Sequence, residues 1–191
     1  MLDRAEDPDD VTLIARIAAR DEDALEALFV RHYAPMSRHA ALLSGDAALA
    51  EDALQEAFVA VWQHASTYRG PSPRAWLYTV ARNALRRQIR MRSADSDALS
   101  LEELGERAGW GDSEAGSRVL AAIESRVSVR EALAGLDPSD REVLSLIDVE
   151  GLSLDEAATA LDLTLAALKS RLHRARLRFV ARLNAEDDHG P

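Results

Sequence analysis

Apolar residues recur at the helical spacing of three and four along most of the chain, and no convincing stretch alternates apolar and polar residues as a β-strand does. The pattern therefore predicts an all-α protein. Capping side chains precede the apolar runs of the first half and mark the expected helix starts. We expect helices to begin at Asp10, after Asp21, after Asp46 and at Ser72-Pro73, and the second of them to bend or restart at Pro35.

Each of these helices has an apolar face suited to a core. The faces are formed by Val11, Ile14 and Ile17 in the first helix, by Leu25, Leu28 and Phe29 in the second, and by Leu54, Phe58, Val61 and Trp62 in the third, which is expected to end near Ala65. The fourth helix, residues 74–92, has a second face that is polar and basic. That face follows helical spacing and consists of Thr79, Arg82, Asn83, Arg86, Arg87 and Arg90.

Residues 93–117 interrupt the helical pattern with a composition rich in Ser, Asp, Glu and Gly, which is typical of a linker. One helical turn is expected within it, at residues 99–104. Helical periodicity resumes at residues 119–134, and Asp137-Pro138 is expected to open a helix that runs to about Val149. The predicted fold is therefore two small helical domains joined by a flexible linker.

The second domain contains the signals of a helix-turn-helix. Gly151 ends one helix, Ser153 and Glu156 form a capping box for the next, and Thr164 caps a third helix after a short turn at residues 162–163. The inward side of that last helix is expected to hold Leu168, Leu172, Ala175 and Phe179, and its outward side Ser170, Arg171, Arg174 and Arg178. A helix with an apolar back and an arginine-rich front is what reading the major groove of DNA requires.

The distribution of charge supports an interaction with a polyanion. The 191 residues have a formal net charge of −10, yet residues 73–94 and 163–185 each contain six basic residues and no acid. The rest of the chain therefore carries a net charge of −22. Nucleic acid would be repelled by most of the molecule and attracted at two places. In the first of them, Asn83 adds a side chain that is able to read a base edge.

Other classes of function find little support. The chain has no cysteine, its first residues lack the basic and apolar regions of a signal peptide, and no segment is apolar enough to span a membrane, so we expect a soluble cytoplasmic protein. The five histidines show no metal-binding spacing, and no glycine-rich phosphate loop follows a strand. We therefore expect no enzyme, no catalytic or metal site, no cofactor and no small-molecule substrate.

Three aromatic residues lie close to the first basic window. Tyr68 precedes the basic helix, and Trp76 and Tyr78 lie near its start. Aromatic rings beside a cationic groove can stack on unpaired bases. Burial of Trp76 in the core is the other interpretation, and it is favoured because tryptophan is usually well buried.

Two segments resemble one known family. "GLSLDEAATALDLTLAALKSRLHRARLRF" resembles the promoter-reading C-terminal domain of bacterial sigma factors of the extracytoplasmic-function (group IV) class, although Ala166-Ala167 stand where the family usually has a pair such as Gly-Thr. "AEDALQEAFVAVWQ" followed by "PRAWLYTVARNALRRQIR" resembles the N-terminal domain of the same class. The resemblance covers about residues 11–92 and 119–180, in the family's order.

The resemblance implies a division of the chain and a role for each part. Residues 1–92 would form the region 2 domain, 93–117 the linker near the polymerase active centre and RNA exit path, 118–182 the region 4 domain, and 183–191 a tail. Core RNA polymerase would be bound by Asp52, Gln55, Glu56 and Val59 at the clamp helices of the largest subunit, with the flap of the second subunit as a further contact. The minus-ten DNA would be held by Tyr68, Arg69, Arg82, Asn83, Arg86 and Arg87, and the minus-thirty-five DNA by Thr164, Lys169, Ser170, Arg171, Arg174 and Arg176. An anti-sigma protein is a further expected partner.

Two other functions compete with this interpretation. A stand-alone helix-turn-helix regulator would explain the second domain, and the last helix alone also looks similar to that of response regulators. A stand-alone regulator would, however, give no role to the basic helix 74–92 or to the polar face around Asp52. An all-helical adaptor that binds no DNA would explain neither acid-free window.

Overall fold

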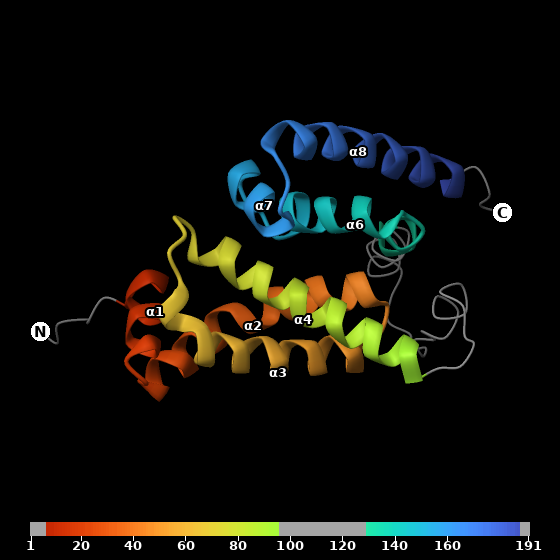
Figure 1. The fold of residues 1–191 in the computed structure, drawn as a ribbon. Helices are drawn as coiled ribbons and strands as arrows, with labels where there is room; N and C mark the ends of the chain where they lie inside the picture. The colour runs from red at the N-terminus through yellow and green to blue at the C-terminus, as the bar shows by residue number, and fades with distance from the viewer. Residues whose placement is uncertain (1–6, 96–128, 188–191) are drawn as a thin grey trace, which may run out of the picture.

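The computed structural model describes residues 7–95 and 129–187, and within these ranges the chain forms helices and no strand (Figure 1). The all-α fold with two helical domains is thereby confirmed. The first domain consists of α1 (Asp10–Ala18), α2 (Glu22–Ser44), α3 (Ala47–His64), the short 3₁₀ helix η1 (Ala65–Thr67) and α4 (Pro73–Asp95). The second consists of the helical residues 129–134, α6 (Pro138–Leu144), the π-helical turn η2 (Ser145–Val149), α7 (Leu154–Leu161) and α8 (Leu165–Asp187).

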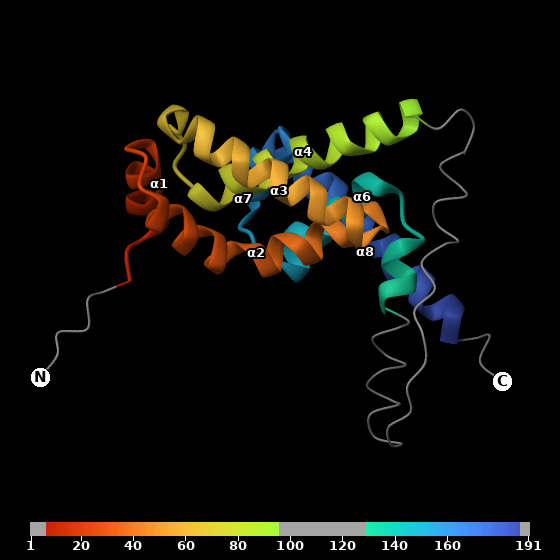
Figure 2. The same ribbon diagram turned by 90° about the horizontal axis from the view of Figure 1, so that it is seen from below.

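Helices α2, α3 and α4 pack along one another and α1 closes one end of this group (Figures 1 and 2). Their core is built from small and branched side chains, and Leu28, Leu54 and Leu77 are fully buried in it. Phe58 is buried from α3, and its ring lies 4.8 Å from that of the more exposed Phe29. Close helix packing follows from the many alanines among the buried residues.

Local capping explains where most of these helices begin. Asp21 accepts a hydrogen bond from the amide of Ala24 at 3.1 Å, and Asp46 accepts one from Leu49 at 3.1 Å. Ser72 accepts one from Ala75 at 3.1 Å, directly before Pro73 at the first position of α4. Gly45 ends α2 with φ 68°, a left-handed conformation that a residue without Cβ adopts at little cost.

Three details of the first domain differ from the sequence-based expectation, and one of them is that Val11, expected on the core face of α1, is exposed. The cap of α1 is Asp9, whose carboxylate accepts a hydrogen bond from Thr12 at 2.8 Å, while Asp10 lies 2.5 Å from Arg31 and 2.7 Å from His32. Asp9 and Asp10 are both aspartates at the expected start of the helix, so the sequence alone does not show which of them caps it. The fold shows that Asp9 is the cap and that Asp10 forms the ion pair. In addition, α2 continues through Pro35 as one helix and does not restart there.

The second domain forms the predicted helix-turn-helix. The capping box of Ser153 and Glu156 is present, Asp162 adopts a left-handed conformation at the turn, and Thr164 accepts a hydrogen bond from Ala167 at 3.2 Å. Leu168, Leu172 and Ala175 are buried, as expected for the inner side of α8. The expected linker helical turn and most of residues 93–117, together with residues 119–128, lie outside the described residues.

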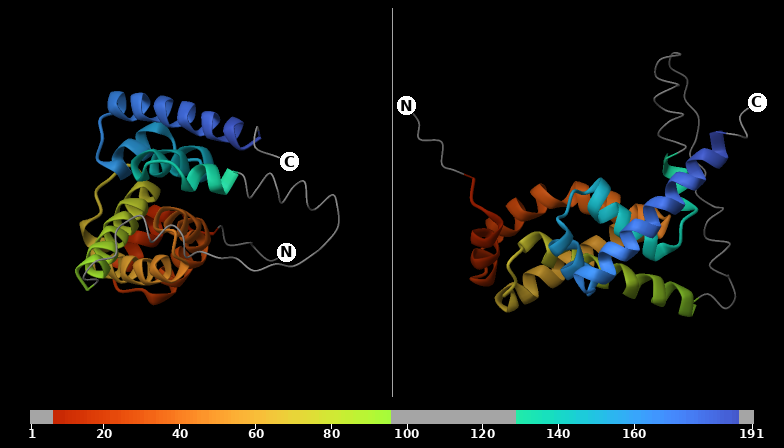
Figure 3. Two further views of the ribbon diagram at one scale, coloured as in Figure 1. Left: turned by 90° about the vertical axis from the view of Figure 1, so that its right-hand side faces the viewer. Right: turned by 90° about the horizontal axis from the view of Figure 1, so that it is seen from above.

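The second domain lies on the first, with α7 against α4 and α6 against α2 (Figures 1 and 3). Among the described residues, no helix is long and apolar enough to cross a membrane.

Candidate polymerase and nucleic-acid interfaces

The predicted polymerase-binding residues lie on one face of α3. Asp52 and Gln55 are exposed, and so is the apolar side chain of Val59, with a relative accessibility of 54%. Glu56 is different because it is partly buried and engaged, 2.8 Å from Arg87 and 2.9 Å from the amide nitrogen of Gln88 in α4. The face therefore has three exposed side chains and a fourth that also joins α3 to α4.

The predicted minus-ten residues of α4 differ in accessibility. Asn83 and Arg87 are exposed, and Arg86 has a half-exposed side chain. Asn83, Arg86, Arg87 and Arg90 line an open groove of about 490 Å³ between α3 and α4, together with Glu56 and His64. Arg82 is largely buried, with 13% of its side chain accessible, because Glu142 of α6 accepts a hydrogen bond from its Nε at 2.8 Å.

The aromatic residues near α4 divide between the core and the loop. Tyr78 is fully buried, whereas Trp76 is partly buried and its ring lies 5.4 Å from that of Tyr68. The Tyr68 hydroxyl is buried and has no partner among the described residues. Arg69 is exposed and donates to the carbonyl oxygens of Ser66 and Tyr68 at 2.7 Å each, which holds it against its own loop.

The predicted minus-thirty-five residues form the outer side of α8. Lys169, Ser170 and Arg174 are exposed, and Arg171 is partly buried. Thr164 is exposed at the start of this helix. Arg176 is held by a bidentate contact to Asp148, with its Nε at 3.1 Å and an Nη at 2.5 Å. Thr164, Lys169, Ser170 and Arg174 are therefore presented to solvent, and Arg176 also ties α8 to η2.

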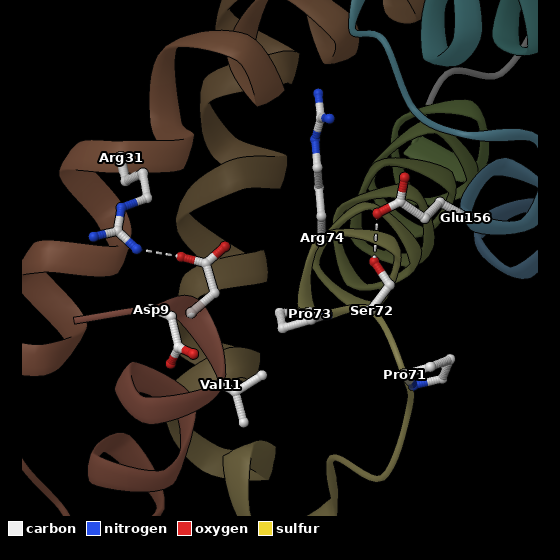
Figure 4. A pocket seen from close by; sticks show the side chains of 9 residues that line it. Asp9, Val11, Arg31, Pro71, Ser72, Pro73, Arg74 and Glu156 are labelled. Atoms are coloured by element: carbon white, nitrogen blue, oxygen red, sulfur yellow. Dashed lines mark hydrogen bonds and ion pairs between the residues drawn. The ribbon is translucent and has the colours of Figure 1, made fainter. Parts of the chain in front are cut away.

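Three glutamates of the second domain contact the first domain, and the sequence predicted none of these contacts. We call Glu142, Glu150 and Glu156 the interdomain acids. Glu150 is buried, accepts a hydrogen bond from the Tyr78 hydroxyl at 3.3 Å and lies 3.5 Å from Arg38. Glu156 accepts a hydrogen bond from Ser72 at 2.7 Å, beside an open cavity that Arg31, Pro73 and Arg74 also line (Figure 4).

A buried histidine lies between the domains next to these acids. His39 of α2 shares a hydrogen bond of 2.8 Å with the hydroxyl of Ser145, and burial lowers the pKa of its imidazole to about 4. Burial also raises the pKa of Glu150, against the opposing effect of Arg38. Both groups favour the uncharged form because they are removed from water.

The depressed pKa of His39 predicts that acid weakens the folded state. The unfolded imidazole has an ordinary pKa near 6.5, so its contribution is complete above that pH and is lost as the pH falls toward 4. We expect the free energy of unfolding by urea to fall by about 2 kcal/mol between pH 7 and pH 5. The raised pKa of Glu150 acts in the opposite direction and offsets part of this loss.

The variant His39→Gln is the control for this titration. It keeps a polar group near Ser145 but has no imidazole to protonate, so its unfolding free energy should change much less over the same pH interval. An equal loss in the variant and in the unchanged protein would show that His39 does not cause the pH dependence.

Two family models match the chain. The model of Sigma-70 region 2 matches residues 28–94, and the model of Sigma-70, region 4 matches residues 126–179. The chain is 34% identical over 167 residues to the ECF RNA polymerase sigma factor SigL of Mycobacterium tuberculosis, which covers 85% of this chain and 90% of that protein. It is 30% identical over 188 residues to the RNA polymerase sigma factor CnrH of Cupriavidus metallidurans, which covers 96% of this chain and 98% of that protein.

Two solved structures have a similar fold. The structure of CnrH in complex with the cytosolic domain of CnrY aligns with a TM-score of 0.65 at 27% identity, over 92% of this chain and 97% of that chain. The sigma factor RpoE in complex with the anti-sigma factor NepR from Bartonella quintana aligns with a TM-score of 0.66 at 27% identity, over 83% and 96%. The two family matches occur in one chain and in the expected order, which does not favour a stand-alone helix-turn-helix regulator.

Proposed function

Because the chain belongs to the extracytoplasmic-function class of sigma-70 factors, and so directs core RNA polymerase to promoters, we propose that three separate surfaces divide this task. The first is the α3 face of Asp52, Gln55, Glu56 and Val59, which binds the clamp helices of the largest polymerase subunit. The second, which we call the strand-capture surface, consists of Tyr68, Arg69, Arg82, Asn83, Arg86 and Arg87 and holds the minus-ten element. The third is the outer side of α8 from Thr164 to Arg176, which reads the minus-thirty-five element.

One observation carries this proposal most strongly: polar groups of the appropriate kind occupy the solvent side of three helices whose other sides are core. On α4, Asn83 offers an amide for base edges and Arg87 a cation for phosphate. On α8, Arg174 offers a planar fork that fits the two acceptors of guanine in the major groove. On α3, exposed Val59 lies among polar side chains, a composition suited to the centre of a protein interface.

The division of the chain supports the same proposal. We assign residues 1–92 to region 2 and 118–182 to region 4, with 93–117 as the linker and 183–191 as the tail. The protein acts by binding and has no catalytic step of its own, and its place of action is the cytoplasm, where the polymerase works. RpoE was solved with an anti-sigma factor and CnrH with the cytosolic domain of CnrY, and we propose that this chain also has an anti-sigma partner.

The strand-capture surface is tested by promoter selection. Holoenzyme reconstituted with this chain is used to select binding sequences from DNA that is randomised at both promoter elements. Asn83→Ala should relax the preference at one or two positions of the minus-ten element, with a cost of about 1 to 3 kcal/mol for the preferred sequence, and leave the minus-thirty-five preference unchanged.

Arg90→Ala is the comparison variant for this selection, because Arg90 lines the same groove but offers only charge to the DNA backbone. It should weaken binding to all sequences alike and reduce the slope of log affinity against log salt by about one. An Asn83→Ala holoenzyme that selects the same minus-ten sequence as the unchanged one would contradict the assignment of Asn83.

A further inference from the structure

Helices α3 and α4 lie side by side, and the open groove between them has one wall from each helix (Figure 1). The α4 wall presents basic side chains of the strand-capture surface together with Asn83. The α3 wall consists of Glu56, Ala60 and His64, which follow one another four residues apart and therefore share one face of the helix. His64 thus lines the same groove as Asn83, from the opposite wall.

The charged groups of this groove are distributed unequally between its walls. The α4 wall carries the cations Arg86, Arg87 and Arg90. On the α3 wall, Glu56 is paired with Arg87 at 2.8 Å. His64 lies about 12 Å further along the axis of α3 than Glu56. A phosphate that enters the groove at the His64 end therefore meets arginines on one side and an imidazole, rather than a carboxylate, on the other.

The imidazole of His64 is available for a ligand. It is exposed at the last position of α3 and has no hydrogen-bond or ion-pair partner among the described residues. The Arg20 guanidinium of α1 donates to the carbonyl oxygen of Trp62 at 2.9 Å. The Thr67 hydroxyl donates to the carbonyl oxygen of His64 itself at 2.7 Å. The end of α3 is therefore fixed through its backbone, and the imidazole takes no part in holding it.

A histidine at this place offers a cation whose presence depends on pH. Imidazole ordinarily gains a proton as the pH falls from about 8 to about 5, whereas arginine and glutamate ordinarily keep their charges. A bound phosphate adds negative charge beside the ring and favours its protonated form, and a helix C-terminus also favours a cation. The charged side chains around the groove and the end of α3 are Arg20 of α1, Glu56 of α3, Arg69 of the following loop, and Arg86, Arg87 and Arg90 of α4.

We propose that His64 is a further DNA-contacting residue of this groove, whose imidazole takes up a proton when it binds a phosphate of the captured minus-ten strand. The proton comes from the solvent and stays on the ring while the phosphate is bound, so no bond of the strand is broken. Capture of the strand is therefore tighter in mildly acidic than in mildly alkaline solution. This inference rests on the proposed function, because it assumes that the groove between α3 and α4 holds this strand.

The test measures binding of a single strand by the holoenzyme at two pH values. A fluorescent oligonucleotide carries the non-template minus-ten sequence found upstream of a mapped start site and lacks the minus-thirty-five element. The unchanged holoenzyme should bind it about 10-fold more tightly at roughly pH 6 than at roughly pH 8, because only the protonated ring forms a charged hydrogen bond to phosphate. The slope of log affinity against log salt should also be steeper at the lower pH by about 0.7, which is the contribution of one further phosphate contact on a single strand.

Two substitutions at position 64 separate the charge from the side chain. His64→Gln keeps a hydrogen-bond donor but gains no proton, so its affinity should differ by less than about 2-fold between the two pH values and should match that of the unchanged chain at the higher one. His64→Arg carries a permanent charge and should bind tightly at both. Because His64 is exposed, neither substitution should change the melting temperature of the chain.

Exchange of His64 with its neighbour Gln63 is the matched control. Gln63 is exposed on α3 but does not line the groove. The double variant Gln63→His, His64→Gln therefore keeps the composition of the chain and moves the imidazole about 100° around the helix axis. It should lose the pH dependence of strand binding, as His64→Gln does.

Two different results would overturn the inference, and they are distinguishable. The first is a holoenzyme that binds the oligonucleotide without any pH dependence, or with one that His64→Gln or the exchanged variant keeps in full. The proposed function would then stand, and His64 would not be the group that takes up the proton. The second is a holoenzyme that binds the oligonucleotide at neither pH, in which case strand capture by this groove is wrong and the inference fails with it.

Discussion

Replacing Asp52, Gln55 and Val59 together by alanine is expected to weaken binding to core RNA polymerase by about 100-fold, because a few exposed residues at the centre of an interface carry most of its affinity. All three side chains are exposed on α3, so their removal should not change the melting temperature. Glu56 is left in place because it also pairs with Arg87 and its loss would disturb the packing of α3 on α4. Affinity is measured by fluorescence anisotropy of the labelled chain during titration with core polymerase.

Glu26→Ala combined with Val30→Ala is the matched control for this triple variant. Glu26 and Val30 are exposed on α2, and the pair removes one acid and one exposed valine, as the triple variant does. The control should bind core polymerase like the unchanged chain. Equal weakening of both variants would indicate a general effect of surface charge, and an unaffected triple variant would exclude the α3 face as the polymerase site.

The second large effect is expected from Arg174→Ala, which should reduce binding of the holoenzyme to its own minus-thirty-five element by roughly 10- to 100-fold. Arg174 is exposed on the outer side of α8, opposite buried Leu172 and Ala175. Loss of a bidentate contact to a base removes discrimination at that position as well as affinity. Binding is measured on duplexes that carry each base substitution of the element.

Arg174→Lys separates base reading from phosphate binding. Lysine keeps the positive charge but lacks the planar fork of arginine, so it should restore only part of the affinity and little of the discrimination. If Arg174→Lys restores both in full, Arg174 contacts phosphate and the reading of bases belongs to its neighbours on α8.

The helices and their starts could be predicted because the interactions that begin a helix are local. The capping residues Asp46, Ser72 and Ser153 each accept a hydrogen bond from a backbone amide three residues further along the chain. A pattern of residue types at that spacing is visible in the sequence. Local information did not separate Asp9 from Asp10, because the distant partners of Asp10, Arg31 and His32, distinguish the two acids. It also did not show that packing carries α2 through Pro35.

The candidate site was predictable in part. The exposed front of α8 followed from the apolar spacing of Leu168, Leu172 and Ala175 on its other side. The partial burial of Arg82 did not follow from any pattern, because its partner Glu142 is 60 residues away. Tyr78 was a signal that sequence reasoning could have used, since it interrupts an otherwise basic stripe and is buried where α4 meets the second domain.

The different environments of Glu56 and Glu142 also required the fold. Both are charged residues of a helix, for which solvent exposure is the usual outcome. In the fold Glu56 joins two helices of one domain and Glu142 joins the two domains. Contacts between elements far apart in sequence are set by tertiary packing, which periodicity does not describe.

Run-off transcription tests most directly whether this chain directs RNA polymerase to promoters through the α3 face. Bacterial core polymerase is supplied with a DNA fragment from upstream of the chain's own gene, with the chain absent, present, or present as the Asp52, Gln55 and Val59 alanine variant. We expect a transcript from one defined start site that requires the chain and is lost with the variant. A chain that binds the fragment tightly and specifically by itself, yet never associates with core polymerase or starts a transcript, would contradict this and identify a stand-alone regulator.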